Sequence, residues 1–169
     1  PLGFVEGVFD KNLFSNIGPH GCNIYSHEFY ETNKKNDFKR GYTIQVLRSD
    51  KAINTARNLH KFNKLKFGKK FHQNFLNYYG KTIPIAIICE DLPEKENRIE
   101  LDYNNKDSDS MPGIKVFYKL SKNTRKILSD GIKNVSKLMI NAGAQKISRF
   151  GPVKHTGWHI MGTATMGLD

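Results

Sequence analysis

The segment SKNTRKILSDGIKNVSKLMINAG, residues 121–143, predicts the one long helix of the chain and with it a layered fold. Its apolar residues recur every three or four positions, which places them on one helix face: Ile127, Leu128, Ile132, Val135, Leu138, Met139 and Ala142. Ser121 or Asn123 can cap the first turn, and Gly143 can end the helix in the left-handed conformation. We therefore expect a helix over about residues 121–142 whose apolar stripe covers a sheet.

The strands of that sheet are expected ahead of this helix. Four segments either alternate apolar with polar residues or form a short apolar run: residues 41–48, 82–89, 98–102 and 114–118. Ile99 and Leu101 are expected to point inward. Turn-rich segments join successive strands, which favours antiparallel pairing. Residues 1–21 carry widely spaced glycines and a Gly-Pro turn, so we expect loop with short extended pieces there.

A shorter helix is expected after Ser49 and Asp50, either of which can cap it. Its apolar face would be formed by Ala52, Ile53, Ala56 and Leu59. Strands joined by turns and covered by helices predict an α+β fold, with an antiparallel sheet flanked by helices.

The composition indicates a globular chain without a membrane span. Of the 169 residues, 38% are hydrophobic, the mean hydropathy is −0.57, and no long uncharged apolar run occurs. Cys22 and Cys89 stand alone, which favours free thiols in a reducing compartment such as the cytoplasm over a disulfide framework. His20, Cys22 and His27 lie close in sequence but lack a fourth ligand nearby, so no metal site is expected.

The formal net charge of +11 raises the alternative of a basic nucleic-acid-binding module. The densest basic run, residues 60–71, interleaves Phe62, Phe67 and Phe71 with five lysines, a pattern that suits stacking of bases and neutralisation of phosphates. It equally suits a surface segment whose aromatic rings dock on the core while the lysines stay hydrated. Because basic residues are spread along the whole chain, the hydrated surface is favoured and no nucleic-acid partner is expected.

The last eleven residues, HIMGTATMGLD (159–169), have the character of an active-site loop. His159 stands three residues before a Gly-Thr step, in a segment without helical or strand periodicity. Gly162 and Gly167 have no Cβ, so the backbone can approach a flat ligand closely. Histidine can bind or release a proton near neutral pH, and loops on a rigid scaffold often carry catalytic groups. Histidines near glycines are also common in plain turns.

This ending, with Gly157 and Trp158 before it, resembles the late signature of the glucose–methanol–choline oxidoreductase family, flavoenzymes that oxidise alcohols. Four upstream motifs are similar to that family's substrate domain in order and spacing: residues 90–93, 97–102, 109–113 and 142–144. One position departs from the pattern, because many relatives carry arginine where this chain has Thr165. The resemblance covers nearly the whole chain.

The resemblance implies FAD-dependent oxidation of the CH–OH group of a small-molecule alcohol. His159 would be the general base that takes the hydroxyl proton. Trp158 would shield the site, and Gly162 and Thr163 would let the backbone lie close to the isoalloxazine ring. The partner residue of the family's catalytic pair would lie beyond Asp169.

The same resemblance implies an internal fragment. No two glycines stand two residues apart, so the dinucleotide fingerprint Gly-x-Gly-x-x-Gly is absent and the flavin domain would lie largely outside the chain. Residues 1–150 would form a substrate-binding domain, and residues 151–169 a catalytic-loop segment leading back to the flavin domain. A non-catalytic relic of that domain, with Thr165 as a sign of decay, is a further alternative. The identity of the alcohol, the electron acceptor and the oligomeric state stay open.

Overall fold

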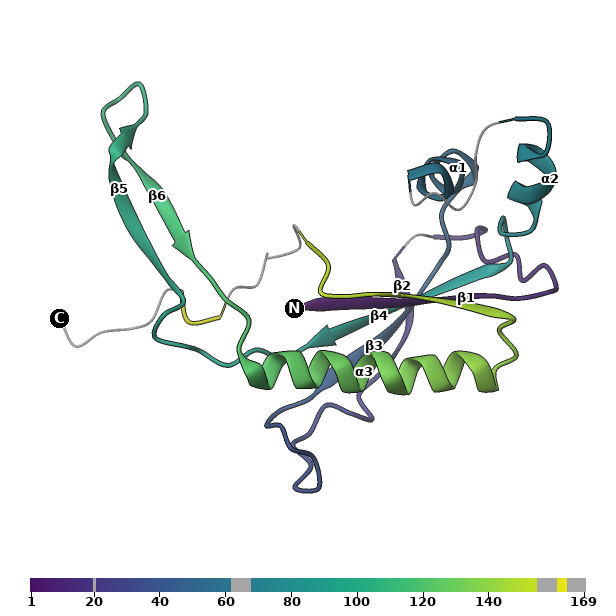
Figure 1. Ribbon diagram of the computed structural model, residues 1–169, viewed down its shortest axis with the longest axis horizontal. Helices are drawn as coiled ribbons and strands as arrows, with labels where there is room; N and C mark the ends of the chain where they lie inside the picture. The colour runs from purple at the N-terminus through teal and green to yellow at the C-terminus, as the bar shows by residue number, and fades with distance from the viewer. Residues whose placement is uncertain (20, 62–67, 155–160, 164–169) are drawn as a thin grey trace.

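The computed structural model describes residues 1–19, 21–61, 68–154 and 161–163. Its centre is a five-stranded antiparallel sheet in the order β2-β3-β4-β1-β7. The strands are β1 (Leu2–Val8), β2 (Cys22–Ser26), β3 (Tyr42–Leu47), β4 (Thr82–Cys89) and β7 (Lys146–Phe150). The first and last strands of the sequence are neighbours, so the sheet joins segments that are far apart in the chain (Figure 1).

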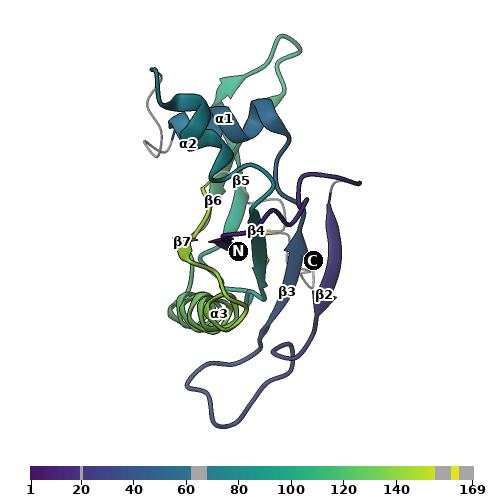
Figure 2. The same cartoon turned by 90° about the vertical axis from the view of Figure 1, so that its right-hand side faces the viewer.

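Helices lie on both sides of this sheet. The long helix α3 (Lys122–Asn141) packs along one face (Figure 2). The shorter helices α1 (Ala52–Lys61) and α2 (Phe71–Leu76) lie toward the other side (Figure 1). The chain is therefore α+β, with an antiparallel sheet flanked by helices, as the sequence predicts. Within the described ranges, no helix has both the length and the apolar character needed to cross a membrane.

The hydrophobic core lies between α3 and the sheet. Ile127 and Val135 of α3 are fully buried and pack in one cluster with Val5 of β1 and Ile85 and Ile87 of β4. Side chains on one face of β1 and β4 form one wall of this cluster, and the apolar face of α3 forms the other.

The predicted long helix is confirmed, with both of its ends. Ser121 is the residue that caps it, because its Oγ accepts a hydrogen bond of 3.1 Å from the Thr124 N–H, and Gly143 adopts a φ of +91°. Two members of the predicted stripe are wrong, since Leu138 is 49% exposed and Ala142 is exposed as well. The helix instead turns Gly131 toward the sheet, where an added Cβ would lie 2.6 Å from Ile87 Cγ2.

The prediction of loop for residues 1–21 is wrong over its first part. Leu2–Val8 forms β1, which pairs with both β4 and β7. Gly3 and Gly7 face α3, where an added Cβ would lie 2.6 Å from Leu128 Cδ1 and 2.8 Å from Met139 Sδ. These glycines mark a close approach of the helix rather than turns, which is why their spacing was misleading.

The remaining strands of the prediction form a separate ribbon that projects from the sheet (Figure 1). This ribbon consists of β5 (Arg98–Lys106) and β6 (Pro112–Phe117). Antiparallel pairing is confirmed, but the expectation that Ile99 and Leu101 point inward is wrong, because they are 45% and 53% exposed. Nothing in the described part of the chain covers them.

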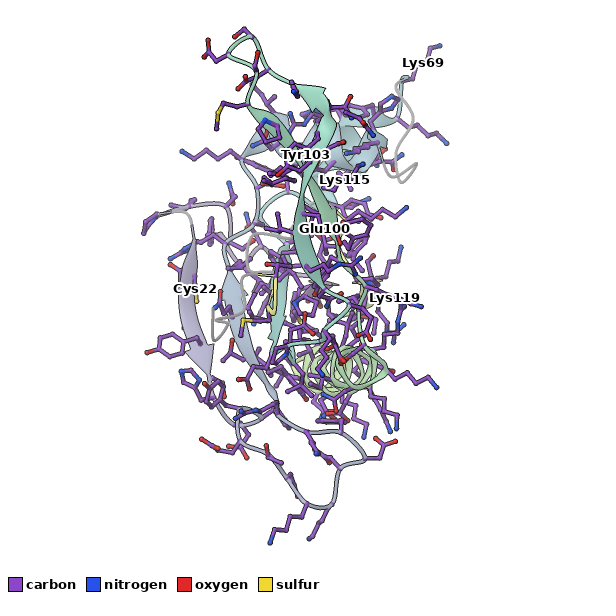
Figure 3. All side chains as sticks on the ribbon, turned by 90° about the vertical axis from the view of Figure 1, so that its left-hand side faces the viewer. Cys22, Lys69, Glu100, Tyr103, Lys115 and Lys119 are labelled. Atoms are coloured by element: carbon purple, nitrogen blue, oxygen red, sulfur yellow. The ribbon has the colours of Figure 1, made fainter. Side chains whose placement is uncertain are left out.

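The two faces of the ribbon differ in chemistry. Register pairs Leu101 with Ile114 on an apolar face. The opposite face carries an ion pair of 3.1 Å between Lys115 Nζ and Asp102 Oδ1. Figure 3 shows Glu100, Tyr103 and Lys115 spread along the ribbon.

Three smaller differences follow from weak burial. Helix α1 is confirmed, but Ile53 of its predicted apolar face is 83% exposed, while Thr55 and Leu59 are buried. Neither β2 nor β7 is predicted from the sequence. Both are short edge strands with few buried residues, so they lack a clear alternating pattern.

Candidate active site

A cavity of about 610 Å³ lies on the sheet face opposite α3. Strands β1, β4 and β7 form its floor, α1 forms one wall, and the segments after β3 and β7 close it. Its lining comprises Phe4, Glu6, Leu47, Arg48, Ser49, Asp50, Thr55, Asn58, Leu59, Tyr78, Thr82, Pro84, Phe150, Gly151, Pro152 and Val153.

Strand alternation explains why this cavity and the core lie on opposite faces of one sheet. On β1, Val5 points to α3 and is fully buried, whereas its neighbours Phe4 and Glu6 line the cavity. Pro84 of β4 is the register partner of Glu6 and lies just beyond the last residue of β4 that pairs with β3. The proline therefore interrupts pairing only at the end of the β3–β4 ladder.

The cavity is apolar over most of its wall and polar at the α1 end. Asp50 is held there by Asn58, whose Nδ2 donates a hydrogen bond of 2.7 Å to Asp50 Oδ2. The Thr55 hydroxyl donates to the Asp50 carbonyl oxygen at 3.0 Å. The Nε atom of Arg48 is buried and has no hydrogen-bond partner among the described residues. No sequence motif predicts this polar end, because its residues come from a loop and a helix.

The segment that carries the predicted catalytic motif begins at the wall of this cavity. Gly151, Pro152 and Val153 line it, and the Val153 N–H donates a hydrogen bond of 2.9 Å to the Leu2 carbonyl oxygen. The motif follows directly in the sequence. His159 and Trp158, like His155 and Thr165, lie outside the described residues, so their predicted roles stay predictions.

Gly162, three residues after His159, is described and lies against another loop. Its φ is +83°, in the left-handed region that favours glycine. A Cβ added there would lie 3.0 Å from Pro93 Cα and 3.1 Å from the Glu94 nitrogen. Contact within the chain therefore explains the absence of a side chain. Contact of Gly162 and the partly buried Thr163 with a flavin stays a prediction.

Pro93 and Glu94 belong to a loop that is tied to α3 by a buried carboxylate. Asp91, only 7% exposed, accepts a hydrogen bond of 2.6 Å from the Thr124 hydroxyl and another from the Tyr118 hydroxyl. Burial, reinforced by this bond to Asp91, raises the pKa of Tyr118, so the phenol stays protonated and donates. The sequence around Asp91 has the character of a turn and does not predict this connection.

Neither of the two cysteines lines the cavity. Cys22 is exposed on β2 (Figure 3) and Cys89 is buried in the core, and both are free thiols. Burial raises the pKa of Cys89 to about 12, so it is a protonated thiol at neutral pH. Within the described ranges, no cluster of three or more histidine, cysteine, aspartate or glutamate side chains is arranged to hold a metal ion.

Comparison with known proteins gives one informative similarity. No protein-family model matches the chain. The chain is 32% identical over 151 residues to a 2-methyl-1,2-propanediol dehydrogenase of Mycolicibacterium austroafricanum. The match covers 89% of this chain and 27% of that protein, so the chain spans about a quarter of the length of this relative. The similarity includes the larger part of the sheet, the cavity and α3, because so little of the chain lies outside it.

Proposed function

We propose that the chain forms the substrate-binding part of an FAD-dependent oxidoreductase that oxidises the CH–OH group of a small alcohol. The observation that carries this proposal is the similarity over 89% of the chain to a protein named as a diol dehydrogenase. The loop motif of residues 157–169 supports it independently, through its resemblance to the glucose–methanol–choline family. In this proposal residues 1–150 are the substrate-binding domain, and residues 151–169 are the catalytic loop.

The cavity on the sheet is the proposed substrate site. Its apolar wall, with Phe4, Pro84 and Phe150, suits the carbon skeleton of an alcohol. The polar groups at the α1 end, with Asp50 and Asn58, suit hydrogen bonding to a second hydroxyl group of the substrate. The segment proposed as the catalytic loop starts at the wall of this cavity, where Gly151, Pro152 and Val153 line it.

The residues of this chain fit one end of FAD only. Apolar walls and a glycine-containing loop suit the flat ring, whereas the diphosphate needs a glycine-rich turn that this sequence lacks. A flavin held there would supply the acceptor for the hydride that leaves the alcohol carbon. Trp158, Gly162 and Thr163 are the residues proposed to lie against the ring, and the loop that they form would exclude water from it.

His159 is the proposed general base. Loss of a hydride from the alcohol carbon yields a carbonyl group only if the hydroxyl proton also leaves. A neutral imidazole within hydrogen-bond reach of that hydroxyl accepts the proton, and the unperturbed pKa of histidine, about 6.5, suits this role near neutral pH. Arg48, whose buried Nε lacks a partner among the described residues, is a candidate donor to a substrate oxygen.

The test uses the complete enzyme and single-turnover kinetics. His159→Ala should slow reduction of bound flavin by alcohol by about 10²–10⁴, because the lost interaction is proton transfer in the transition state. His155→Ala is the matched control and should cost much less. Anaerobic mixing with alcohol, followed by the bleaching of flavin absorbance, measures both rates. Flavin reduction at the wild-type rate in His159→Ala would reject the assignment, and a complete protein without flavin would reject the proposed function.

A further inference from the structure

The loop that follows β4 is fixed at its start by Asp91. The carboxylate accepts hydrogen bonds from three different parts of the molecule: the Thr124 hydroxyl in the first turn of α3 at 2.6 Å, the Tyr118 hydroxyl just after β6, and the Leu92 N–H of the loop itself at 3.1 Å. Thr124 is fully buried and Asp91 nearly so. These donors hold one carboxylate between a helix, the ribbon and the loop.

The far end of the same loop is fixed by Asn97, which is 2% exposed. Its Oδ1 accepts a hydrogen bond of 2.8 Å from the Lys119 N–H, and its Nδ2 donates to the Lys119 carbonyl oxygen at 3.3 Å. The Asn97 N–H donates to the Glu94 carbonyl oxygen at 3.0 Å, which closes a turn. Pro93 and Glu94 therefore lie between two anchored points.

Gly162 packs on the backbone between these two anchors. The position of its absent Cβ lies 3.0 Å from Pro93 Cα and 3.1 Å from the Glu94 nitrogen, so the two backbones are in direct contact. A displacement of Pro93 would consequently move or release the backbone that begins three residues after His159. Packed backbone transmits small displacements because it cannot be compressed.

We propose that Asp91 is a positioning residue of the proposed active site, which sets the place of Gly162, three residues after His159 in the sequence, through Pro93 and Glu94. This inference rests on the proposed function. In this proposal Asp91 acts through its position and transfers no proton to or from the substrate, because its carboxylate already accepts hydrogen bonds from three donors. Its hydrogen bond with Thr124 ties the loop that contains Pro93 and Glu94 to the N-terminus of α3. Its hydrogen bond with Tyr118 ties the same loop to the segment after β6.

The test compares matched variants in the complete, flavin-loaded enzyme. Thr124→Val has nearly the shape of threonine but lacks the donor to Asp91, whereas Thr124→Ser keeps the hydroxyl. Tyr118→Phe removes a second donor at a less buried position. Thr124→Val and Tyr118→Phe should each lower the limiting rate of flavin reduction by about tenfold to a hundredfold, the scale on which misplacement of a catalytic group acts. Thr124→Ser should keep the wild-type rate of flavin reduction, because it keeps the hydroxyl that donates to Asp91.

Tyr42→Phe is the control for a merely structural effect. Tyr42 is 1% exposed and lies among core residues, and its hydroxyl donates a hydrogen bond of 3.0 Å to Asp130 Oδ2 of α3 without contacting Asp91 by a hydrogen bond. It should lower thermal stability and leave the rate unchanged. The pH at which the rate is half maximal should not move in the Thr124 and Tyr118 variants, since Asp91 exchanges no proton.

Each outcome separates this inference from the proposed function. Wild-type rates in both Thr124→Val and Tyr118→Phe, with stability lowered as in Tyr42→Phe, would overturn the positioning role while His159→Ala still tests the function. A shifted pH profile would also overturn it, because Asp91 would then take part in proton transfer. If Thr124→Val does not fold, the rate of flavin reduction in Tyr118→Phe alone tests the positioning role. A wild-type enzyme whose flavin no alcohol reduces would overturn both proposals together.

Discussion

The main sheet and the β5–β6 ribbon have the same kind of sequence but differ in what covers their apolar faces. In the sheet, Val5 and Ile87 are fully buried because α3 lies over them. In the ribbon, four apolar side chains of one face are between 45% and 67% exposed: Ile99, Leu101, Ile114 and Val116. Alternation thus determines which side chains share a face, whereas their burial depends on a segment that lies elsewhere in the sequence.

The ribbon is attached to the main body through polar contacts at its base. A two-stranded ribbon has little stability of its own in water. The Asn97 side chain joins the two strands through the Lys119 backbone, the Tyr118 hydroxyl joins the ribbon to Asp91, and the Thr124 hydroxyl joins Asp91 to α3. The sheet is therefore held by apolar packing and the base of the ribbon by hydrogen bonds.

The largest expected difference is between isoleucines of the two regions. Ile127→Ala, at a fully buried position, should lower the free energy of unfolding by about 2–5 kcal/mol through lost burial and an unfilled cavity. Ile114→Ala, at a position 67% exposed, should change it by no more than about 0.5 kcal/mol. Urea denaturation of the purified chain measures both. Equal losses would mean that the apolar face of the ribbon is covered in solution.

A smaller effect is expected on the polar face of the ribbon. The Asn105 amide and the Lys115 ammonium lower the pKa of Asp102, so folding favours its charged form. Since the folded-state pKa lies below the unfolded value of roughly 3.9, the contribution to stability is present above that value and is lost as the pH falls through the folded-state pKa.

Carbon-13 NMR titration of the Asp102 carboxyl group tests this directly. Lys115→Ala should move the pKa of Asp102 back toward its ordinary value, because one of the groups that favour the carboxylate is gone. Lys119→Ala removes an equal charge from an exposed position after β6 and is the matched control (Figure 3). A pKa that responds equally to both substitutions would point to the net charge of the ribbon rather than to the contact between Lys115 and Asp102.

Local signals predicted the elements that depend on local sequence. Thr82–Cys89 matches the predicted strand at both ends, and Ser121 and Gly143 end α3 as their chemistry requires. Strand β1 could not be found in this way, because Gly3 and Gly7 resemble turn residues until α3 is placed against them. The same limit applies to Ile99, whose alternation is clear but whose exposure depends on what lies beside it.

The candidate site also has one part that local sequence predicts and another that depends on contacts between distant segments. The predicted catalytic motif around His159 is continuous in sequence, together with Gly162, so the prediction could be made from one window of the chain. The cavity needs residues from four strands, a helix and three loops, so no window of sequence contains it. Asp91 stands in a sequence typical of a turn, and its hydrogen-bond partners Tyr118 and Thr124 lie 27 and 33 residues further along the chain. Only the folded chain brings those groups together.

The smallest effect is expected on the solvent side of α3, where lysines carry much of the positive charge. Lys126 is an example, because its Nζ forms an ion pair of 2.8 Å with Asp37 and is not free to neutralise a phosphate without losing that contact. A nucleic-acid site would release several counterions on binding, so its affinity would fall steeply with salt, by a slope of about −0.9 per phosphate contacted. Charges that only keep a helix face hydrated give weak, non-specific binding, with a dissociation constant on the order of 10⁻⁴–10⁻⁶ M.

We therefore expect fluorescence anisotropy with labelled duplex and single-stranded DNA to show no tighter complex at physiological ionic strength. Lys126→Ala should leave that result unchanged. Tight DNA binding by the wild-type chain that Lys126→Ala weakens would contradict this expectation and identify this face of α3 as a nucleic-acid-binding surface.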